Sequence, residues 1–424
     1  MAPKTLTSFY IFLSALVFSR AIGSFEPSIT PVPGPASTGV IPTSVTYSSN
    51  GKWLANANSG DGSVSFFKVD SDGSLTPITG SPVFLPSLNG VNSVAYSPDS
   101  RFLSAVGNGS NQVTVFQVDS STGALLPDPI VVDNQIPNAA QWQGIYSPNG
   151  NFFTVLNHAV SLSTFQIPDR TTGALIPSST TVPAGSILVE EGSGREEAYS
   201  PDSAFLAWAY GPTGSNPIGG VVVFAVNQTT GGLGFQQTYP VATATGGMSA
   251  VAYSPDGTLL AATDLGNTLT VFSVTPQTGV LTPWAQQRVT PDSPSGQCCT
   301  FSPDNKFLAV TNLGTGNIYV YSVGATNQTL TQFGGPLTTG DGPFDIAFSP
   351  INAEGISFFS TANFDGTLSS YAFSLCPAIG SVTINSPATG ADLTAGSVVT
   401  ISGTLSVNGN SVTVTSSVVN GPPN

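Results

Sequence analysis

Charged residues are scarce in this sequence, and positive charge is the scarcest. Only 8% of the 424 residues are charged, and 9 Lys and Arg stand against 23 Asp and Glu, which gives a net charge of −14 at neutral pH. A chain of this charge, with no cluster of basic residues, is repelled by nucleic-acid phosphates and by anionic membrane surfaces. The composition therefore argues against a nucleic-acid-binding protein.

Long apolar runs are also missing, except for one near the N-terminus. Residues 8–19 are predominantly apolar, Lys4 supplies a positive charge before them, and Ala21 and Gly23 are small residues of the kind that signal peptidase reads. The run is too short to span a bilayer comfortably. We therefore expect residues 1–23 to be a cleaved signal peptide. The mature protein is expected to be secreted, extracellular or at the cell surface, with no membrane span.

Cysteine and histidine offer little material for disulfides or metal sites. The chain contains three cysteines, Cys298, Cys299 and Cys376, and one histidine, His158. We identify no cofactor motif and no metal-binding motif, and we expect neither ligand. The adjacent pair Cys298-Cys299 is either a strained vicinal disulfide or two reduced, buried small residues, and the pattern of the repeats favours the second interpretation.

Glycine and proline are abundant instead, with 46 and 34 residues in a chain that is 40% hydrophobic. No stretch shows a sustained helical period with start and stop signals. This composition predicts many short strands joined by tight turns. The predicted fold class is all-β.

One short phrase occurs seven times along the chain. Its forms include YSPDGTLLAATD and FSPDNKFLAVTN, in which an aromatic residue precedes Ser-Pro-Asp-Gly or a close variant. These anchor aromatics recur every 47 to 54 residues, a period that fits a four-stranded propeller blade. The seven anchors are Tyr47, Tyr96, Tyr146, Tyr199, Tyr253, Phe301 and Phe348.

Each repeat divides into four strands. A short strand ends at the anchor aromatic, Pro and Gly form a tight turn, and an apolar second strand follows, such as residues 307–312. After an alternating third strand, such as residues 268–274, a Thr-Gly-x-Leu turn leads to a weaker fourth strand. A single four-stranded sheet cannot cover both of its faces, whereas seven sheets around one axis bury each face against the next. We predict a seven-bladed β-propeller over residues 24–376.

The two ends of the propeller segment are predicted to meet. Residues 28–34 (SITPVPG) resemble the fourth-strand segment 74–80 (SLTPITG), so we expect the N-terminal segment to supply the closing strand of the seventh blade and to protect its edge. Residues 377–424 contain three further strand patterns. We predict a partial immunoglobulin-like β segment there, because a complete domain takes about 100 residues.

These repeats resemble the YVTN-type and lactonase-like seven-bladed propellers, a family that includes 6-phosphogluconolactonase. The resemblance rests on Ser-Pro-Asp-Gly followed by Phe-Leu-Ala-Val-Thr-Asn, on Ile-Tyr-Val-Tyr-Ser-Val and on Thr-Gly-x-Leu, and it covers residues 28–376. It implies the propeller fold and, in some members, hydrolysis of sugar lactones. Members that do chemistry carry His, Arg and Glu side chains at the channel mouth, just before the first strands.

Residues three and four positions before each anchor line this predicted channel mouth. None of them is a histidine, and few are cations. Recognition of a phosphorylated sugar would need more Lys and Arg donors than this lining offers, so hydrolysis of a phosphogluconolactone is disfavoured. Aromatic faces beside amide groups, such as those of Trp142 and Phe344, suit a neutral sugar or a peptide segment, or else the rings pack between blades. The candidate ligand-binding residues are Asn92, Trp142, Gln143, His158, Arg195, Glu196, Glu197, Gln297 and Asp345.

The most highly charged segment of the chain falls in this candidate region. Residues 190–197 (EEGSGREE) hold five charges. They either bind a polar ligand, activate water or hold a cation, or else form a solvated loop in which Arg195 neutralises its neighbours. His158 is the default general base if the protein is an enzyme, and otherwise a polar surface residue.

Three functions follow from these observations. The lining without histidine and with few cations favours a secreted, monomeric, non-catalytic propeller that binds a protein or glycan partner through its channel-mouth face. The alternative is a divergent lactonase-like hydrolase of a non-phosphorylated sugar lactone or related ester, in which Glu196, Glu197 and His158 act. A further alternative is a structural surface or adhesion component.

Overall fold

The computed structural model describes the chain from residue 27 onward, with gaps. The described residues are 27–109, 111–134, 140–157, 161–181, 196–211, 218–241, 247–266, 268–284, 288–289, 296–374, 379–386, 398–407 and 410–419. Their regular elements are β-strands apart from one 3-10 helix, η1 (Pro86–Leu88). No helix among these residues has the length and apolarity of a membrane span. The all-β prediction is confirmed.

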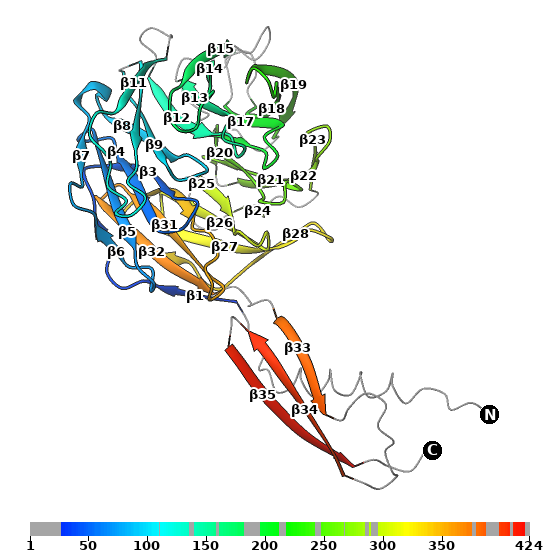
Figure 1. Ribbon diagram of the computed structural model, residues 1–424. Helices are drawn as coiled ribbons and strands as arrows, with labels where there is room; N and C mark the ends of the chain where they lie inside the picture. The colour runs from blue at the N-terminus through cyan, green and yellow to red at the C-terminus, as the bar shows by residue number, and fades with distance from the viewer. Residues whose placement is uncertain are drawn as a thin grey trace. The chain divides into compact units, whose positions relative to one another are not determined.

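Seven antiparallel sheets form the blades of the molecule (Figure 1). Blade one holds β3 (Pro42–Tyr47), β4 (Trp53–Asn58), β5 (Ser63–Val69), β6 (Leu75–Pro77) and β7 (Val83–Phe84). Blade two holds β8 (Val91–Tyr96), β9 (Phe102–Gly107), β10 (Gln112–Gln117) and β11 (Ile130–Asp133). Blade three holds β12 (Gln141–Tyr146), β13 (Phe152–Asn157), β14 (Ser161–Gln166) and β15 (Ile176–Thr181). Blade four holds β16 (Glu197–Tyr199), β17 (Phe205–Tyr210), β18 (Gly220–Val226) and β19 (Leu233–Pro240).

The other three blades, like blade one, have an outer strand that is split in two. Blade five holds β20 (Met248–Tyr253), β21 (Leu259–Asp264), β22 (Thr268–Thr275), β23 (Val280–Pro283) and β24 (Arg288–Val289). Blade six holds β25 (Gly296–Phe301), β26 (Phe307–Asn312), β27 (Asn317–Gly324), β28 (Thr329–Gln332) and β29 (Leu337–Thr338). Blade seven holds β30 (Pro343–Phe348), β31 (Ile356–Asn363) and β32 (Thr367–Ser374), with β1 (Ser28–Pro31) and β2 (Ala36–Ser37) outside them.

The seven blades close into a ring. The first strands of successive blades contact one another from β3 through β8, β12, β16, β20 and β25 to β30, and β30 contacts β3 again. Each of these seven strands ends at the anchor aromatic that the repeat predicts. The seven-bladed propeller is therefore confirmed.

The N-terminal segment completes blade seven. Both β1 and β2 pair with β32, the third strand of that blade. The N–H of Val32 donates to the carbonyl of Ser370 at 2.9 Å, and the N–H of Thr38 donates to the carbonyl of Gly366 at 3.0 Å. The segment lies where its similarity to residues 74–80 places it, and it covers an edge that would otherwise be open.

The C-terminal residues form a separate sheet. Strands β33 (Ile379–Ser386), β34 (Val398–Val407) and β35 (Asn410–Val419) pair in antiparallel order, and they belong to the smaller of the two compact units of the chain. The three predicted strand patterns thus correspond to three strands. An immunoglobulin-like sandwich consists of two packed sheets. The described residues of this segment form a single sheet, so the immunoglobulin-like interpretation stays a prediction.

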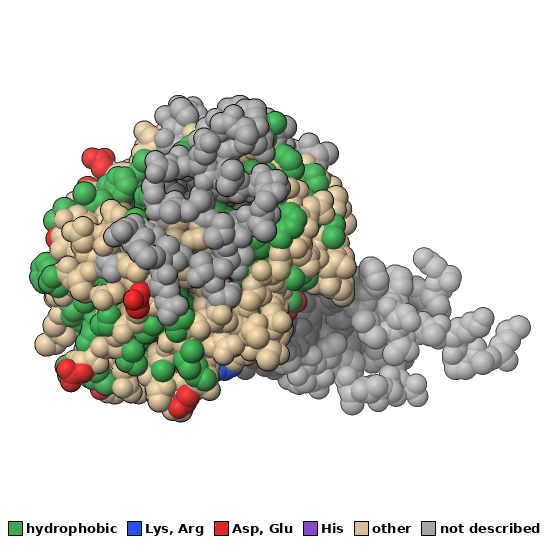
Figure 2. All heavy atoms as spheres, turned by 90° about the horizontal axis from the view of Figure 1, so that it is seen from above, with side chains coloured by type: hydrophobic (Ala, Val, Ile, Leu, Met, Phe, Trp, Pro, Cys, Tyr) green, Lys and Arg blue, Asp and Glu red, His purple; other side chains and the backbone are tan. Residues whose placement is uncertain are grey.

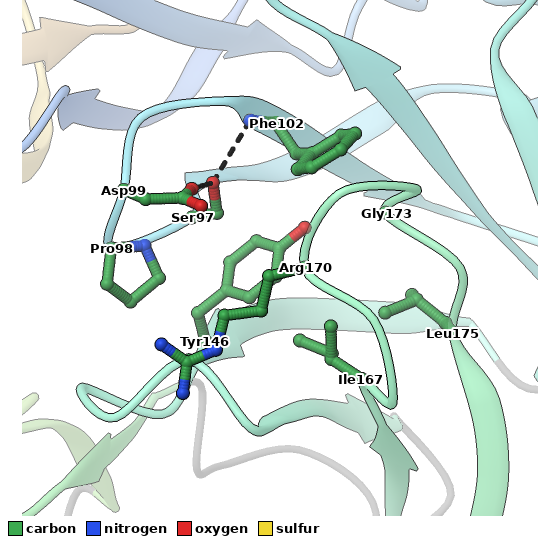
Figure 3. A pocket seen from close by; sticks show the side chains of 10 residues that line it. Ser97, Pro98, Asp99, Phe102, Tyr146, Ile167, Arg170, Gly173 and Leu175 are labelled. Carbon is green, nitrogen blue, oxygen red and sulfur yellow. Dashed lines mark hydrogen bonds between the residues drawn. The ribbon is translucent and has the colours of Figure 1, made fainter.

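The repeated serine after each anchor aromatic has a structural task. In blade two, the hydroxyl of Ser97 accepts a hydrogen bond from the N–H of Phe102 at 3.0 Å and donates to the carboxylate of Asp99 at 2.6 Å (Figure 3). The same pair of bonds is made by Ser200, Ser254 and Ser302. Ser147 makes the equivalent pair, with the amide oxygen of Asn149 in place of the carboxylate. The serine therefore fixes the turn between the first and second strands, which explains its recurrence without any catalytic role.

The hydroxyl groups of the anchor tyrosines lie at the contacts between neighbouring blades. Tyr47 shares a hydrogen bond of 2.6 Å with Ser360 on the second strand of the preceding blade, and Tyr199 is paired with Thr154 in the same way. Tyr253 instead packs in a cluster with Ala207, and its buried hydroxyl has no described partner. Whether an anchor hydroxyl is satisfied thus depends on one residue of the blade before it.

Replacing Tyr253 by Phe is expected to leave the free energy of unfolding unchanged or to raise it by up to about 1 kcal/mol, because the hydroxyl removed is buried without a partner. Tyr199→Phe is expected to lower it by about 1–2 kcal/mol, because the hydroxyl of Thr154 stays buried and loses its partner. Chemical denaturation of the two variants checks the difference. Equal losses in both would contradict this account of the blade interfaces.

Candidate functional site

A cavity of about 200 Å³ lies among the innermost strands of the propeller. It is lined by the first strands of blades one, two, three, six and seven, together with Glu196, which directly precedes β16 of blade four. Its polar lining residues include Ser44, Ser93, Gln143, Glu196, Cys298 and Asp345. The polar groups of the cavity therefore come from residues that are far apart in the sequence.

A second cavity of about 30 Å³ shares several of these residues and adds an aromatic wall. Phe344 and Trp142 line it with Asn92. The ring of Phe344 also stacks on Phe364 with centroids 4.9 Å apart, and Trp142 packs against a core cluster of blades three and four. Each ring therefore packs on the protein and also borders the cavity, and the binding of a sugar or a peptide by these rings stays a prediction.

The two cavities bring five of the nine candidate residues together. Those five are Asn92, Trp142, Gln143, Glu196 and Asp345. His158, Arg195 and the side chain of Gln297 lie outside the described part of the chain. Glu197 lines neither cavity.

Glu197 is enclosed within the blades instead. Its residue is 2% exposed, and it pairs with Trp208 across β16 and β17. Burial raises the pKa of its carboxyl well above the ordinary value. The backbone N–H of Glu197 donates to Oε1 of Gln143 at 2.6 Å, so this residue orients Gln143 through its main chain.

Asp345 is held in place by backbone donors from two blades. Its Oδ2 accepts the N–H of Val45 at 2.8 Å, and its Oδ1 accepts the N–H of Ile346 at 2.7 Å. A register shift between Pro343 and Asp345 interrupts the pairing of β30 with β31 at this point. Burial raises the pKa of the Asp345 carboxyl, and these donors oppose the rise only in part.

Cys298 lies between two carboxylates. Its Sγ is 3.2 Å from Oδ1 of Asp345 and 3.5 Å from Oε2 of Glu196. Burial raises the pKa of the thiol well above its ordinary value, and the two neighbouring carboxylates raise it further. The thiol is therefore protonated and weakly nucleophilic at neutral pH in the absence of a cation.

The two adjacent cysteines are both free and buried. This confirms the interpretation of Cys298 and Cys299 as reduced small residues. The grouping of Cys298 with Glu196 and Asp345 was not predicted, because the thiol is separated by 102 residues from one carboxylate and by 47 from the other. The available signal was their common place in the repeat, three residues before an anchor aromatic.

The electrostatics of the site are acidic. Among the described residues, those lining the two cavities include no Lys, Arg or His. One face of the described chain carries mostly hydrophobic and uncharged side chains, with acidic groups at scattered points (Figure 2). An uncharged or cationic ligand is favoured over an anionic one in such a cavity.

Solved structures with the same fold differ in their described activities. A periplasmic gluconolactonase from Pseudomonas aeruginosa is 20% identical, with 73% of this chain and 89% of that chain covered and a TM-score of 0.60. A candidate 6-phosphogluconolactonase from Bacteroides fragilis is also 20% identical, with 72% and 86% covered and a TM-score of 0.58. Hydrazine synthase from Kuenenia stuttgartiensis is 15% identical, with 80% and 98% covered and a TM-score of 0.58. At these identities the similarity shows the fold alone.

Sequence comparison identifies the family directly. No curated protein matches the chain significantly. The family model described as lactonase, seven-bladed β-propeller, matches residues 14–299 and 292–384, which together span most of the chain. The protein therefore belongs to the lactonase family of seven-bladed β-propellers.

Proposed function

We propose that the protein is a lactonase-type hydrolase whose substrate is a sugar lactone, or a related ester, without a phosphate group. The observation that carries this proposal is the convergence of Glu196 and Asp345 on one cavity of a propeller that belongs to the lactonase family. Family membership favours hydrolysis over the non-catalytic binding role, which the scarcity of cations and histidines alone had favoured.

The reaction needs two kinds of group. Water adds to the lactone carbonyl carbon, the ring C–O bond breaks, and a proton passes to the leaving oxygen, which gives a hydroxy acid. A general base must take a proton from the attacking water, and the carboxylates of Glu196 and Asp345 are the groups available in the cavity. A donor must stabilise the carbonyl oxygen as it gains charge.

Gln143 is the donor that the geometry offers for this oxygen. Its Oε1 accepts the N–H of Glu197, so the orientation of the amide is fixed. Gln143 lines both cavities, and its Nε2 donor remains for the substrate. A preoriented amide stabilises an oxyanion better than water does, because it needs no reorganisation during the reaction.

The charge of the cavity determines the substrate class. Two carboxylates and the lack of described cations disfavour a phosphate group, which is recognised by Arg or Lys in most sites. The rings of Trp142 and Phe344 offer flat apolar surfaces to the carbon face of a sugar ring. A neutral sugar lactone meets both conditions.

The proposal is tested by comparing neutral and phosphorylated lactones. Initial rates with glucono-δ-lactone and with 6-phosphogluconolactone are measured by titration of the acid released. Purified protein is expected to hydrolyse the neutral lactone above the buffer rate, with kcat/KM at least about tenfold higher than for the phosphorylated one, because close like charges cost several kcal/mol. A buffer-level rate for a panel of neutral lactones would refute the proposal and leave the non-catalytic binding role.

A further inference from the structure

Three potential metal ligands from three different blades meet in the cavity. They are Glu196 before β16, Cys298 on β25 and Asp345 on β30, and their ligand atoms all lie within 4.8 Å of one another. Sγ of Cys298 is 3.2 Å from Oδ1 of Asp345 and 3.5 Å from Oε2 of Glu196. With Zn–S near 2.3 Å and Zn–O near 2.0 Å, the sulfur and oxygen ligands of a tetrahedral site are about 3.5 Å apart. The two sulfur–oxygen distances therefore match those of a zinc site, and the two carboxylate oxygens lie within 4.8 Å of each other.

Two of the three ligands are fixed by the strands that carry them. The N–H of Cys298 donates to Oγ1 of Thr311 at 3.0 Å. The carboxylate of Asp345 accepts backbone N–H groups from Val45 and Ile346. Supporting hydrogen bonds of this kind orient metal ligands and are part of what sets metal affinity. The carboxylate of Asp345 and the main chain of Cys298 are therefore held in place by neighbouring strands.

The buried sulfur is a further feature of this cluster that suits a cation. Cys298 is 4% exposed, and its thiol faces carboxylate oxygens on two sides. A thiol has one proton and can donate to only one acceptor at a time, so the second sulfur–carboxylate contact would need a proton on a carboxyl group. A divalent cation among the three atoms would make both contacts favourable, and the thiol proton would pass to solvent.

The ligand types select the metal. Thiolate is a soft ligand that favours Zn²⁺ and Co²⁺, whereas Mg²⁺ and Ca²⁺ favour sites made of oxygen alone. We propose that Glu196, Cys298 and Asp345 bind one Zn²⁺ ion, with the fourth coordination position open to the cavity. Three protein ligands with one open position are the arrangement of catalytic zinc sites, in which the metal activates a water molecule. That catalytic role rests on the proposed function, whereas binding of the ion does not.

Metal binding is measured on the full chain, without any assay of activity. Metal-free protein is titrated with Co²⁺ and followed by absorption, and with Zn²⁺ by calorimetry. We expect one ion per chain, a thiolate-to-cobalt charge-transfer band in the near ultraviolet, and no saturable binding of Mg²⁺ or Ca²⁺ under the same conditions. Absence of the band, or equal binding of Ca²⁺ and Zn²⁺, would overturn the proposal.

Two cysteine variants form a matched pair for this test. Cys298→Ser is expected to abolish the cobalt band and to weaken Zn²⁺ binding at least about tenfold. Cys299→Ala, at the adjacent buried residue, is expected to keep the band. Thermal unfolding shows whether both variants fold, and Glu196→Gln, which retains the thiol, is expected to weaken Zn²⁺ binding as well. A band that survives Cys298→Ser, or Zn²⁺ affinity unchanged in Glu196→Gln, would overturn the assignment.

Arg195 provides the competing explanation, since it adjoins Glu196 in the sequence. If its guanidinium neutralises the cluster, metal binds only to Arg195→Gln and not to the unmodified protein, and the proposal fails. If the unmodified protein and Arg195→Gln bind Zn²⁺ with the same affinity, the proposal stands. Metal binding without lactone hydrolysis would remove the proposed function and keep the site. Hydrolysis by a protein that binds no metal and is unaffected by chelators would remove the site and keep the function.

Discussion

Glu196→Gln is expected to lower kcat/KM for a neutral lactone by at least about 100-fold, because a group that activates the attacking water contributes rate factors of this size. The substitution keeps the shape of the side chain and removes its negative charge. Glu196 is partly exposed in the cavity, so the midpoint of unfolding is expected to stay where it is. Steady-state kinetics and a denaturation curve on the same preparation check the two expectations together.

The control for this substitution is an acidic residue outside the cavity. Asp341 is exposed and lines neither cavity, so Asp341→Asn removes one charge and should change kcat/KM less than twofold. Asp345→Asn is expected to lose both activity and stability, because both oxygens of Asp345 accept backbone N–H groups and an amide offers only one acceptor. If Glu196→Gln retains activity within twofold of the original protein, the acidic cavity is not the catalytic site.

Gly173→Ala is expected to lower the free energy of unfolding by about 3 kcal/mol, through two separate effects. Gly173 has φ of +70°, a backbone conformation that alanine adopts only with strain. A Cβ atom there would also lie 2.5 Å from Cδ1 of Phe102. Figure 3 shows the loop of Gly173 lying against the ring of Phe102, which is the first residue of β9 in the preceding blade.

Gly334→Ala separates the two effects. Gly334 has the same φ of +70°, but a Cβ atom there would meet nothing within 4 Å. This variant should therefore cost only the backbone strain, about 1 kcal/mol. Denaturant unfolding followed by tryptophan fluorescence gives both values. A loss in Gly173→Ala no larger than the loss in Gly334→Ala would show that contact with Phe102 does not constrain this turn.

The same contact recurs around the ring, which explains the Thr-Gly-x-Leu turn of the repeat. The glycine of this turn lies against the first residue of the second strand in the blade before it, where any Cβ would meet an aromatic ring. The pairs are Gly123 with Trp53, Gly173 with Phe102, Gly231 with Phe152 and Gly279 with Phe205. The sequence alone shows that this glycine recurs, but its contact with a residue about 70 positions earlier in the chain becomes visible only when the blades are packed.

The architecture could be predicted from the sequence because each blade repeats the same local requirements. The Ser-Pro-Asp-Gly turn depends on neighbours within a few residues, as the contacts of Ser97 show. The closing position of the N-terminal segment was also accessible, because residues 28–34 carry the pattern of a fourth strand. Local patterns of this kind specify strands and turns wherever they occur.

The chemistry of the site could be predicted only in part. The rule of counting back from each anchor identified Glu196 and Asp345, and the structure places both in one cavity. The same rule included Cys298 among the lining residues without a role, since the neighbours of a thiol depend on which blades face one another across the axis. Glu197 follows Glu196 directly, yet it turns into the blade because successive residues of a strand point to opposite sides.

Closure of blade seven by β1 and β2 also has a consequence for the order of assembly. The earliest part of the propeller to be synthesised must pair with β32, more than 320 residues later in the chain. The ring therefore stays open, with one unpaired strand edge, until synthesis of the propeller is nearly complete. Such long-range pairing is slow to form, and an exposed edge invites association with other chains. A nascent copy of this protein depends on its own first strand to end that period of exposure.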